Sequence, residues 1–209
     1  MLEGRRTPFI AKEGILFLLA AAILTAVVLH FWGAVTAALP AALFIYLFFI
    51  FRDPRRQIPA IPLGVVSPAD GVVVDVGVTD KGIVDGESHR IVIRVNSLGT
   101  YTARCPIEGK IMDLHGEPLE RIVTSDKYGL WVRSDEGDDV VLQFRGHRFG
   151  LAPLAFLRYG ERVGQGQRCA YLRLTRYAEV QLPIASRVLV KVGQRVMAGA
   201  DVLAKLPHP

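Results

Sequence analysis

Hydrophobic residues fill one uninterrupted stretch near the start of the chain. Residues 15–51 contain no Asp, Glu, Lys or Arg, whereas polar and apolar positions mix in the rest of the 209-residue sequence. A helix through the whole stretch would be roughly 55 Å long at about 1.5 Å per residue, while the hydrocarbon core of a membrane is roughly 30 Å thick. One straight membrane-spanning helix is therefore not expected.

The sequence HFWG at residues 30–33 lies near the midpoint of this stretch. Its glycine weakens a helix, and its tryptophan is of a type enriched at membrane interfaces. We predict a helical hairpin with membrane-spanning segments at about residues 15–29 and 34–51. A single tilted span with an amphipathic flank is the alternative.

Basic residues on either side of the stretch indicate its orientation. They are Arg5, Arg6 and Lys12 before it, and Arg52, Arg55 and Arg56 after it. Cytoplasmic flanks of membrane helices carry an excess of Lys and Arg. We therefore predict that both ends of the hairpin, and the domain that follows it, face the cytoplasm.

Beyond residue 56, short runs of alternating polar and apolar residues replace the apolar stretch. Runs such as GVVVDVGV, HRIVIRV, VVLQFRG and RVLVKV are typical of β-strands, and turn sequences such as DEGDD separate them. We predict a membrane anchor at residues 1–56, a proline-containing linker at 57–64 and an all-β domain, a sandwich or barrel of short strands, at 65–209.

Two pairs of similar motifs occur within this β domain. GERVGQG at residues 160–166 and GQRVMAG at 193–199 share G-x-R-V-x-x-G, while PADGVV at 68–73 and PIEGKI at 106–111 share Pro-x-acid-Gly. Glycines at this spacing suit a strand, a tight turn and a second strand, because glycine accepts positive φ. Such paired elements are common in barrel-sandwich domains, so the motifs predict fold and not function.

Charge and cysteine content narrow the classes of partner. The formal net charge is +5, and residues 1–56 hold six basic and three acidic side chains, so the basic excess flanks the membrane segment, where it can meet anionic lipid headgroups. No basic stripe interleaved with aromatic residues indicates a nucleic-acid partner. Cys105 and Cys169 lie in strand-like sequence without metal-ligand spacing. We predict buried thiols of a reducing compartment and no metal site.

Several motifs in order along the chain resemble the phosphatidylserine decarboxylase family, particularly its short bacterial and archaeal form. They are KEG at residues 12–14, FRDPRRQIP at 51–59, VVSPADGVV at 65–73, R-x-P-x-x-G-K-I at 104–111 and the closing VGQRVMAGADVLA. The resemblance covers nearly the whole chain. It implies an all-β, barrel-sandwich-like decarboxylase domain at the inner (cytoplasmic) membrane of a bacterium or archaeon.

The resemblance also implies a specific chemistry. In this family a serine in a Gly-Ser pair attacks the carbonyl before it, the chain breaks at the resulting ester, and the new N-terminus becomes a pyruvoyl group. That group forms a Schiff base with the substrate amine and accepts electrons as carbon dioxide leaves. A histidine and an aspartate assist proton transfer.

The residues that carry this chemistry in the family are replaced here. The family's F-G-S-R-V-D-x-x-L-P aligns on LTRYAEVQLP, so its glycine becomes Thr175 and its processing serine becomes Arg176. Its D-V-H-x-N-R-x-P aligns so that the histidine becomes Tyr101 and the aspartate becomes Gly99, and its N-E-R aligns on KYG at residues 127–129. Arginine cannot form the ester.

Two hypotheses about function follow. In the first, the protein is a decarboxylase-like membrane protein that forms no pyruvoyl group, needs no cofactor and acts as a lipid- or partner-binding module. In the second, it is an active enzyme that makes phosphatidylethanolamine, with Thr175 processed to a 2-ketobutyryl group in place of pyruvoyl. The candidate catalytic residues are then Asp70 of SPADG, Thr175 and His147.

Weaker alternatives concern two other sites. Ala185-Ser186 superficially resembles the processing pair, although it falls after the predicted strand. Lys127, preceded by Asp126, resembles the modified lysine of lipoyl carrier domains, although the domain here is nearly twice as long as such a carrier.

Under either hypothesis an anionic, phosphatidylserine-like phospholipid is the expected partner. Arginines in segments that the family places around its substrate pocket are candidates for binding the headgroup. They are Arg104, Arg145, Arg148, Arg173 and Arg176. The alternative is that these arginines lie on solvated strand faces. A homo-oligomer and a pairing with an active relative stay open.

Overall fold

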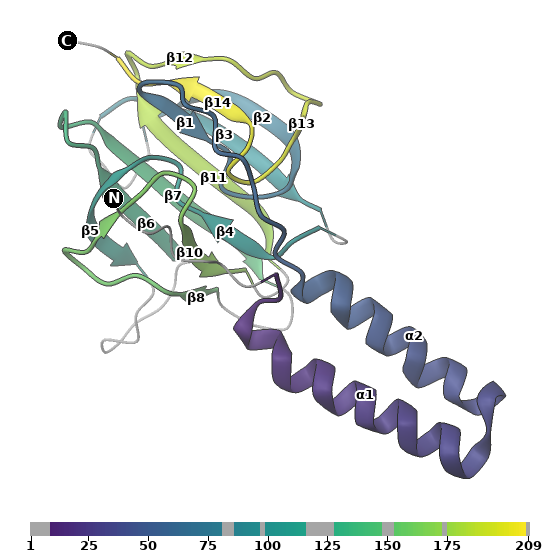
Figure 1. The fold of residues 1–209 in the computed structure, drawn as a ribbon. Helices are drawn as coiled ribbons and strands as arrows, with labels where there is room; N and C mark the ends of the chain where they lie inside the picture. The colour runs from purple at the N-terminus through teal and green to yellow at the C-terminus, as the bar shows by residue number, and fades with distance from the viewer. Residues whose placement is uncertain are drawn as a thin grey trace. The chain divides into compact units, whose positions relative to one another are not determined.

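The computed structural model describes residues 9–80, 86–96, 99–115, 128–147, 153–172 and 175–207 (Figure 1). The chain forms two compact units. One comprises residues 1–55 with 98–100, and the other comprises residues 56–97 with 101–209.

The first unit contains a helical hairpin. Helix α1 (Lys12–Trp32) and helix α2 (Ala34–Phe51) are separated by Gly33 alone, whose φ of 83° and ψ of 179° break the helical path. Among the described residues, these two helices are long and apolar enough to cross a membrane. The predicted hairpin and the position of its break are therefore confirmed.

Close packing joins the two helices at the open end of the hairpin. A Cβ at Gly14 would lie 2.1 Å from Cγ of Phe51, and the rings of Phe17 and Phe51 stack with centroids 5.7 Å apart. The backbone N–H of Ala11 donates to the carbonyl of Phe51 at 2.8 Å. Leu18, Ala21 and Ala37 are also buried, whereas many other apolar side chains of the hairpin point outward; Leu16, for example, is 75% exposed. Exposed apolar surface all round a helix is expected where lipid replaces water.

The second unit is made of strands, which confirms the all-β prediction. In the described residues an eight-stranded sheet has the order β13-β2-β3-β11-β7-β6-β5-β9, and two three-stranded sheets have the orders β1-β14-β12 and β4-β10-β8 (Figure 1). The bounds are β1 Gly64–Val66, β2 Gly71–Thr79, β3 Ser88–Val95, β4 Thr102–Arg104, β5 Gly109–His115, β6 Tyr128–Arg133, β7 Asp139–His147, β8 Leu154–Ala155, β9 Arg162–Val163, β10 Arg168–Tyr171, β11 Thr175–Pro183, β12 Arg187–Val188, β13 Arg195–Val196 and β14 Val202–Lys205.

The domain consists of two similar halves. The motif pairs found in the sequence occupy equivalent places: the Pro-x-acid-Gly motifs begin β2 and β5, and the G-x-R-V motifs form their partners β13 and β9 at opposite edges of the large sheet. The paired residues are Gly71 with Val196 and Val72 with Arg195 in one half, and Gly109 with Val163 and Lys110 with Arg162 in the other. The half from β4 to β10 is inserted between β3 and β11 of the other.

Apolar side chains that alternate along the central strands form the core. Val180 of β11 pairs with Ile91 of β3 and Leu142 of β7, and all three side chains are fully buried. Cys105 and Cys169 are also buried and free, as predicted. The pKa of the Cys105 thiol is raised, mainly by its hydrogen bond with Cys169 and then by burial.

Candidate functional site

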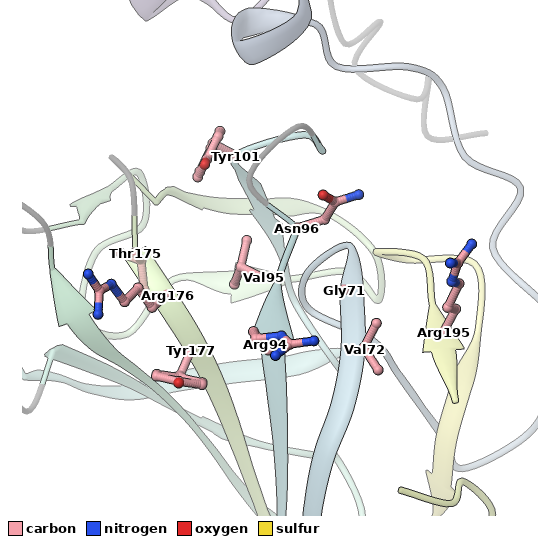
Figure 2. Close-up of a pocket in the computed structure, with 10 residues that line it drawn as sticks. All are labelled: Gly71, Val72, Arg94, Val95, Asn96, Tyr101, Thr175, Arg176, Tyr177 and Arg195. Carbon is pink, nitrogen blue, oxygen red and sulfur yellow. The ribbon is translucent and has the colours of Figure 1, made fainter. Parts of the chain in front are cut away.

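A cavity of about 690 Å³ opens on the half of the domain that contains β2, β3, β11 and β13 (Figure 2). We call it the arginine cavity. Its lining residues are Gly71, Val72, Arg94, Val95, Asn96, Tyr101, Thr175, Arg176, Tyr177 and Arg195. Three of them, Tyr101, Thr175 and Arg176, are the positions aligned in the sequence with the family's histidine, glycine and processing serine. The structure therefore brings these three positions together.

A cross-strand row forms one wall of the arginine cavity. Tyr177 of β11 pairs with Arg94 of β3, Arg94 pairs with Val72 of β2, and Val72 pairs with Arg195 of β13. Side chains of directly paired residues project from the same face of a sheet. Arg94 and Arg195 thus share this face with Tyr177. In Figure 2, Arg94 lies between Arg176 and Arg195.

The equivalent arginines in the other half are neutralised. Arg133 of β6 corresponds to Arg94, and it forms two bonds to Asp139, its partner on β7: Nε to Oδ1 at 2.8 Å and Nη2 to Oδ2 at 3.0 Å. This ion pair raises the pKa of Arg133. Arg162 of β9, which corresponds to Arg195, pairs with Asp135.

The arginines that line the arginine cavity differ from Arg133 and Arg162. Tyr177 occupies the register position that Asp139 holds in the other half. In the described part of the chain no carboxylate lies within salt-bridge distance of Arg94, Arg176 or Arg195. All three side chains are exposed. The same fold thus produces two arginine pairs, and only the pair at the arginine cavity is left for an external anion.

Thr175 is held by a local hydrogen bond. Its side chain is 3% exposed, its hydroxyl donates to the carbonyl of Leu172, and its backbone N–H donates to the same carbonyl at 2.9 Å. A pyruvoyl group does not fit the neighbouring position, because Arg176 has no hydroxyl from which the precursor ester could form. Leu174, which precedes Thr175, lies outside the described residues.

Asp70 uses both carboxylate oxygens in structural contacts. Oδ2 accepts from Nη2 of Arg56 at 2.7 Å, and Oδ1 accepts from the backbone N–H of Ala198 at 2.7 Å. The residue does not line the arginine cavity. Its contacts fasten the segment before β2 to the segment after β13.

Two of the predicted headgroup arginines also make internal contacts. Arg104 is 5% exposed, and its Nη1 donates to the carbonyl of Gly166 at 3.0 Å. Arg145 donates to Gln143 at 2.8 Å and pairs with the buried carboxylate of Glu179 at 3.3 Å. Neither lines the arginine cavity, whereas Arg176 does.

His147 and Ser186 are not among the residues that line the arginine cavity. The backbone of His147 pairs with Thr175 at the end of β7. Ser186 is buried in the turn after β11, and its hydroxyl has no hydrogen-bond partner among the described residues. The predicted sites at Arg148, Arg173 and Lys127 lie outside the described residues. Within the described ranges, no cluster of His, Cys, Asp or Glu could hold a metal ion.

Sequence reasoning missed Arg94, Arg195 and Tyr177. Arg94 belongs to a strand that alternates regularly, so nothing in its local sequence separates it from a solvated strand residue. Arg195 belongs to the repeated G-x-R-V motif, which predicts fold but does not by itself indicate a binding site. Comparing the halves residue by residue would have shown that the first lacks counterparts to Asp135 and Asp139.

Comparison with known proteins identifies relatives along nearly the full length. The chain is 30% identical over 208 residues to the phosphatidylserine decarboxylase proenzyme of Burkholderia ambifaria (strain MC40-6), which covers 95% of this chain and 97% of the relative. It is 30% identical over 209 residues to the proenzyme of Nitrosomonas europaea (strain ATCC 19718 / CIP 103999 / KCTC 2705 / NBRC 14298), with 95% of each chain covered. No family model matches the chain.

Among solved structures, glucose permease IIA from Mycoplasma capricolum superposes with a TM-score of 0.46 and 17% identity, covering 68% of this chain and 94% of that one. This similarity is too low to bear on function. The matches to the two proenzymes, each covering 95% of this chain, lead to one conclusion: the chain belongs to the phosphatidylserine decarboxylase family.

Proposed function

We propose that this protein is a member of the family that forms no pyruvoyl group and binds an anionic phospholipid headgroup in the arginine cavity. The observation that carries the proposal is the content of that cavity. Arg176 stands at the position aligned with the processing serine, and Arg94 and Arg195 lie nearby with no carboxylate partner among the described residues. At the position aligned with the reacting hydroxyl, the chain carries the positive charge of Arg176.

The chemistry of a phospholipid headgroup fits these residues. Guanidinium groups form charge-assisted, often bidentate hydrogen bonds with phosphate and carboxylate oxygens. A phosphatidylserine-like headgroup carries both kinds of oxygen, and the arginines flanking the cavity can bind them at separate points. The cavity volume of about 690 Å³ is within the usual range of small-molecule sites, about 300–1,000 Å³.

The location proposed for this activity is the inner membrane of a bacterium or archaeon. The apolar hairpin associates the chain with a membrane, and the basic residues on both of its flanks favour a cytoplasmic position for the β domain. A lipid ligand would then come from the cytoplasmic leaflet.

The second candidate is an active decarboxylase processed at Thr175. Membership of the family and the retained Asp70 favour it. Against it, Asp70 is engaged by Arg56, and the Thr175 hydroxyl donates to Leu172. The position of the family's histidine is occupied by Tyr101.

The intact mass of the purified, detergent-solubilised protein separates the two candidates. A single species at 23.0 kDa is expected if no processing occurs. Two chains divided before residue 175, the shorter with a blocked N-terminus, would contradict the proposal and make the protein a decarboxylase with a new prosthetic group.

Lipid binding is then measured on the same preparation. Native mass spectrometry with phosphatidylserine and phosphatidylcholine should show preference for the anionic lipid. Arg94→Gln should weaken that binding about tenfold or more, because a charge-assisted hydrogen bond contributes about 1.5–3 kcal/mol. Arg133→Gln, the equivalent change in the other half, is the matched control and should leave binding unchanged. Equal effects of both variants would contradict the assigned site.

A further inference from the structure

The edge of the β domain from residue 187 to residue 197 has an unusual outer surface, which we call the basic edge. Arg187, Leu189 and Lys191 are exposed, whereas Val188 is half-buried and Val190 is 6% exposed. Side chains alternate across an extended chain with a period of two. One outward face therefore carries a cation, an apolar side chain and a second cation in succession.

A tight turn forms the tip of the basic edge. The backbone N–H of Gln194 donates to the carbonyl of Lys191 at 3.1 Å, and Gly193 adopts a φ of 90°. This turn leaves Val192 62% exposed. Beyond it, Arg195 is exposed on β13 while Val196 is buried. Residues 184–200 contain three basic side chains and no Asp or Glu.

The corresponding turn of the other half differs in charge but not in geometry. There the backbone N–H of Glu161 donates to the carbonyl of Arg158 at 3.1 Å, and Tyr159 is exposed at the tip. A carboxylate thus occupies the position of Gln194, and the arginine that follows pairs with Asp135. The uncompensated charge of the basic edge is therefore not imposed by the fold.

We propose that the basic edge docks on the anionic surface of a phospholipid bilayer, with Val192 and Leu189 entering the interfacial region and the three cations contacting headgroups. Apolar side chains flanked by Lys and Arg are what interfacial binding requires. A polyanion such as nucleic acid would use the cations but not the exposed Val192 and Leu189. A second copy of the same edge would meet like charge.

Docking of the basic edge would also position the arginine cavity. Arg195 belongs both to the basic edge and to the lining of the arginine cavity. An edge held at the headgroups therefore brings the mouth of the cavity to the level of its proposed ligand. The docking surface does not depend on what the cavity binds, so each can fail separately.

The test uses the full chain in lipid nanodiscs. Cys105 and Cys169 are buried, so Val192→Cys can be labelled selectively with an environment-sensitive fluorophore. In nanodiscs containing phosphatidylglycerol, we expect a blue-shifted emission that is quenched by lipids spin-labelled near the headgroup. Tyr159→Cys, labelled in the equivalent turn, is the matched control and should report an aqueous environment.

The second part of the test removes positive charges from the basic edge and measures docking. Each Lys or Arg beside an anionic leaflet contributes about 1 kcal/mol, so Lys191→Gln and Arg187→Gln should each lower the ratio of docked to undocked protein about fivefold. Any of three results would overturn the proposal: no lipid quenching at residue 192, equal quenching at residues 192 and 159, or equal quenching in phosphatidylcholine alone. Protection from aqueous iodide without lipid quenching would also overturn it and indicate a protein partner instead.

Discussion

The substitution Tyr177→Asp would reproduce, at the arginine cavity, the neutralisation that exists in the other half of the domain. Tyr177 pairs with Arg94 in the same register in which Asp139 pairs with Arg133. An aspartate at position 177 can therefore reach the neighbouring guanidinium with bonds of the observed kind, 2.8 Å and 3.0 Å. Arg94 would then no longer be available to an external anion.

The expected magnitudes follow from this geometry. Because Arg94 is exposed, a new ion pair should raise the free energy of unfolding by at most about 1 kcal/mol. The headgroup, however, would lose a charge-assisted contact of about 2 kcal/mol, which corresponds to roughly thirtyfold weaker binding. The variant should therefore bind anionic lipid poorly while unfolding at an unchanged or slightly higher temperature.

Lipid titration followed by native mass spectrometry measures the effect, and thermal unfolding in detergent checks the fold. Tyr177→Asn is the control, because it removes the same aromatic ring without adding charge and leaves Arg94 unpaired. Equal affinity of the Asp and Asn variants for phosphatidylserine would refute the reasoning, since the effect would then come from the lost ring.

Three further changes test the packing and charge of the β domain. Gly71→Ala should lower the free energy of unfolding by about 2 kcal/mol, because its Cβ would lie 2.2 Å from a backbone oxygen of β3. Gly77→Ala on the same strand is the control, because no atom lies within 4 Å of its Cβ, and it should not lower stability. Thermal unfolding compares the two variants. Arg145→Met should lower the unfolding temperature without weakening lipid binding, since it leaves the buried carboxylate of Glu179 unpaired. Burial, and then neighbouring carboxylates, raise the pKa of Asp138, so its ionised form opposes folding. Asp138→Asn should therefore stabilise the protein at neutral pH, and the gain should vanish in acid, below about pH 4; a gain that persists there would contradict this cause.

The hairpin and the strands were predictable because each depends on local pattern. An apolar stretch without charge has few stable solutions in lipid, and Gly33 is the natural place for its reversal. The alternating runs GVVVDVGV, HRIVIRV and VVLQFRG likewise became strands, whereas in RVLVKV only Arg187–Val188 forms one. The motif pair at residues 68–73 and 106–111 predicted repeated structure correctly. Each motif requires its glycine, because a Cβ at Gly71 or Gly109 would lie 2.2 or 2.1 Å from a carbonyl oxygen of the neighbouring strand.

The candidate site was only partly predictable. Alignment with the family motifs located Tyr101, Thr175 and Arg176, and the structure places all three at one cavity. The headgroup assignments of Arg104 and Arg145 did not lead to that cavity, since a sequence does not reveal which arginine is satisfied internally. The partners of these two, Gly166 and Glu179, lie 62 and 34 residues away along the chain.

The sequence alone determined the class of the fold, the apolar helical hairpin and the family, because these depend on composition, local periodicity and residue identity at motif positions. Only the tertiary structure decided which positive charges remain available. Cross-strand register pairs Arg133 with Asp139 but sets Arg94 against Tyr177, and insertion of one half within the other brings β3 beside β11. Whether a charge is neutralised depends on distances of a few ångströms between strands that are far apart in the sequence. The order of residues along the chain does not specify these distances.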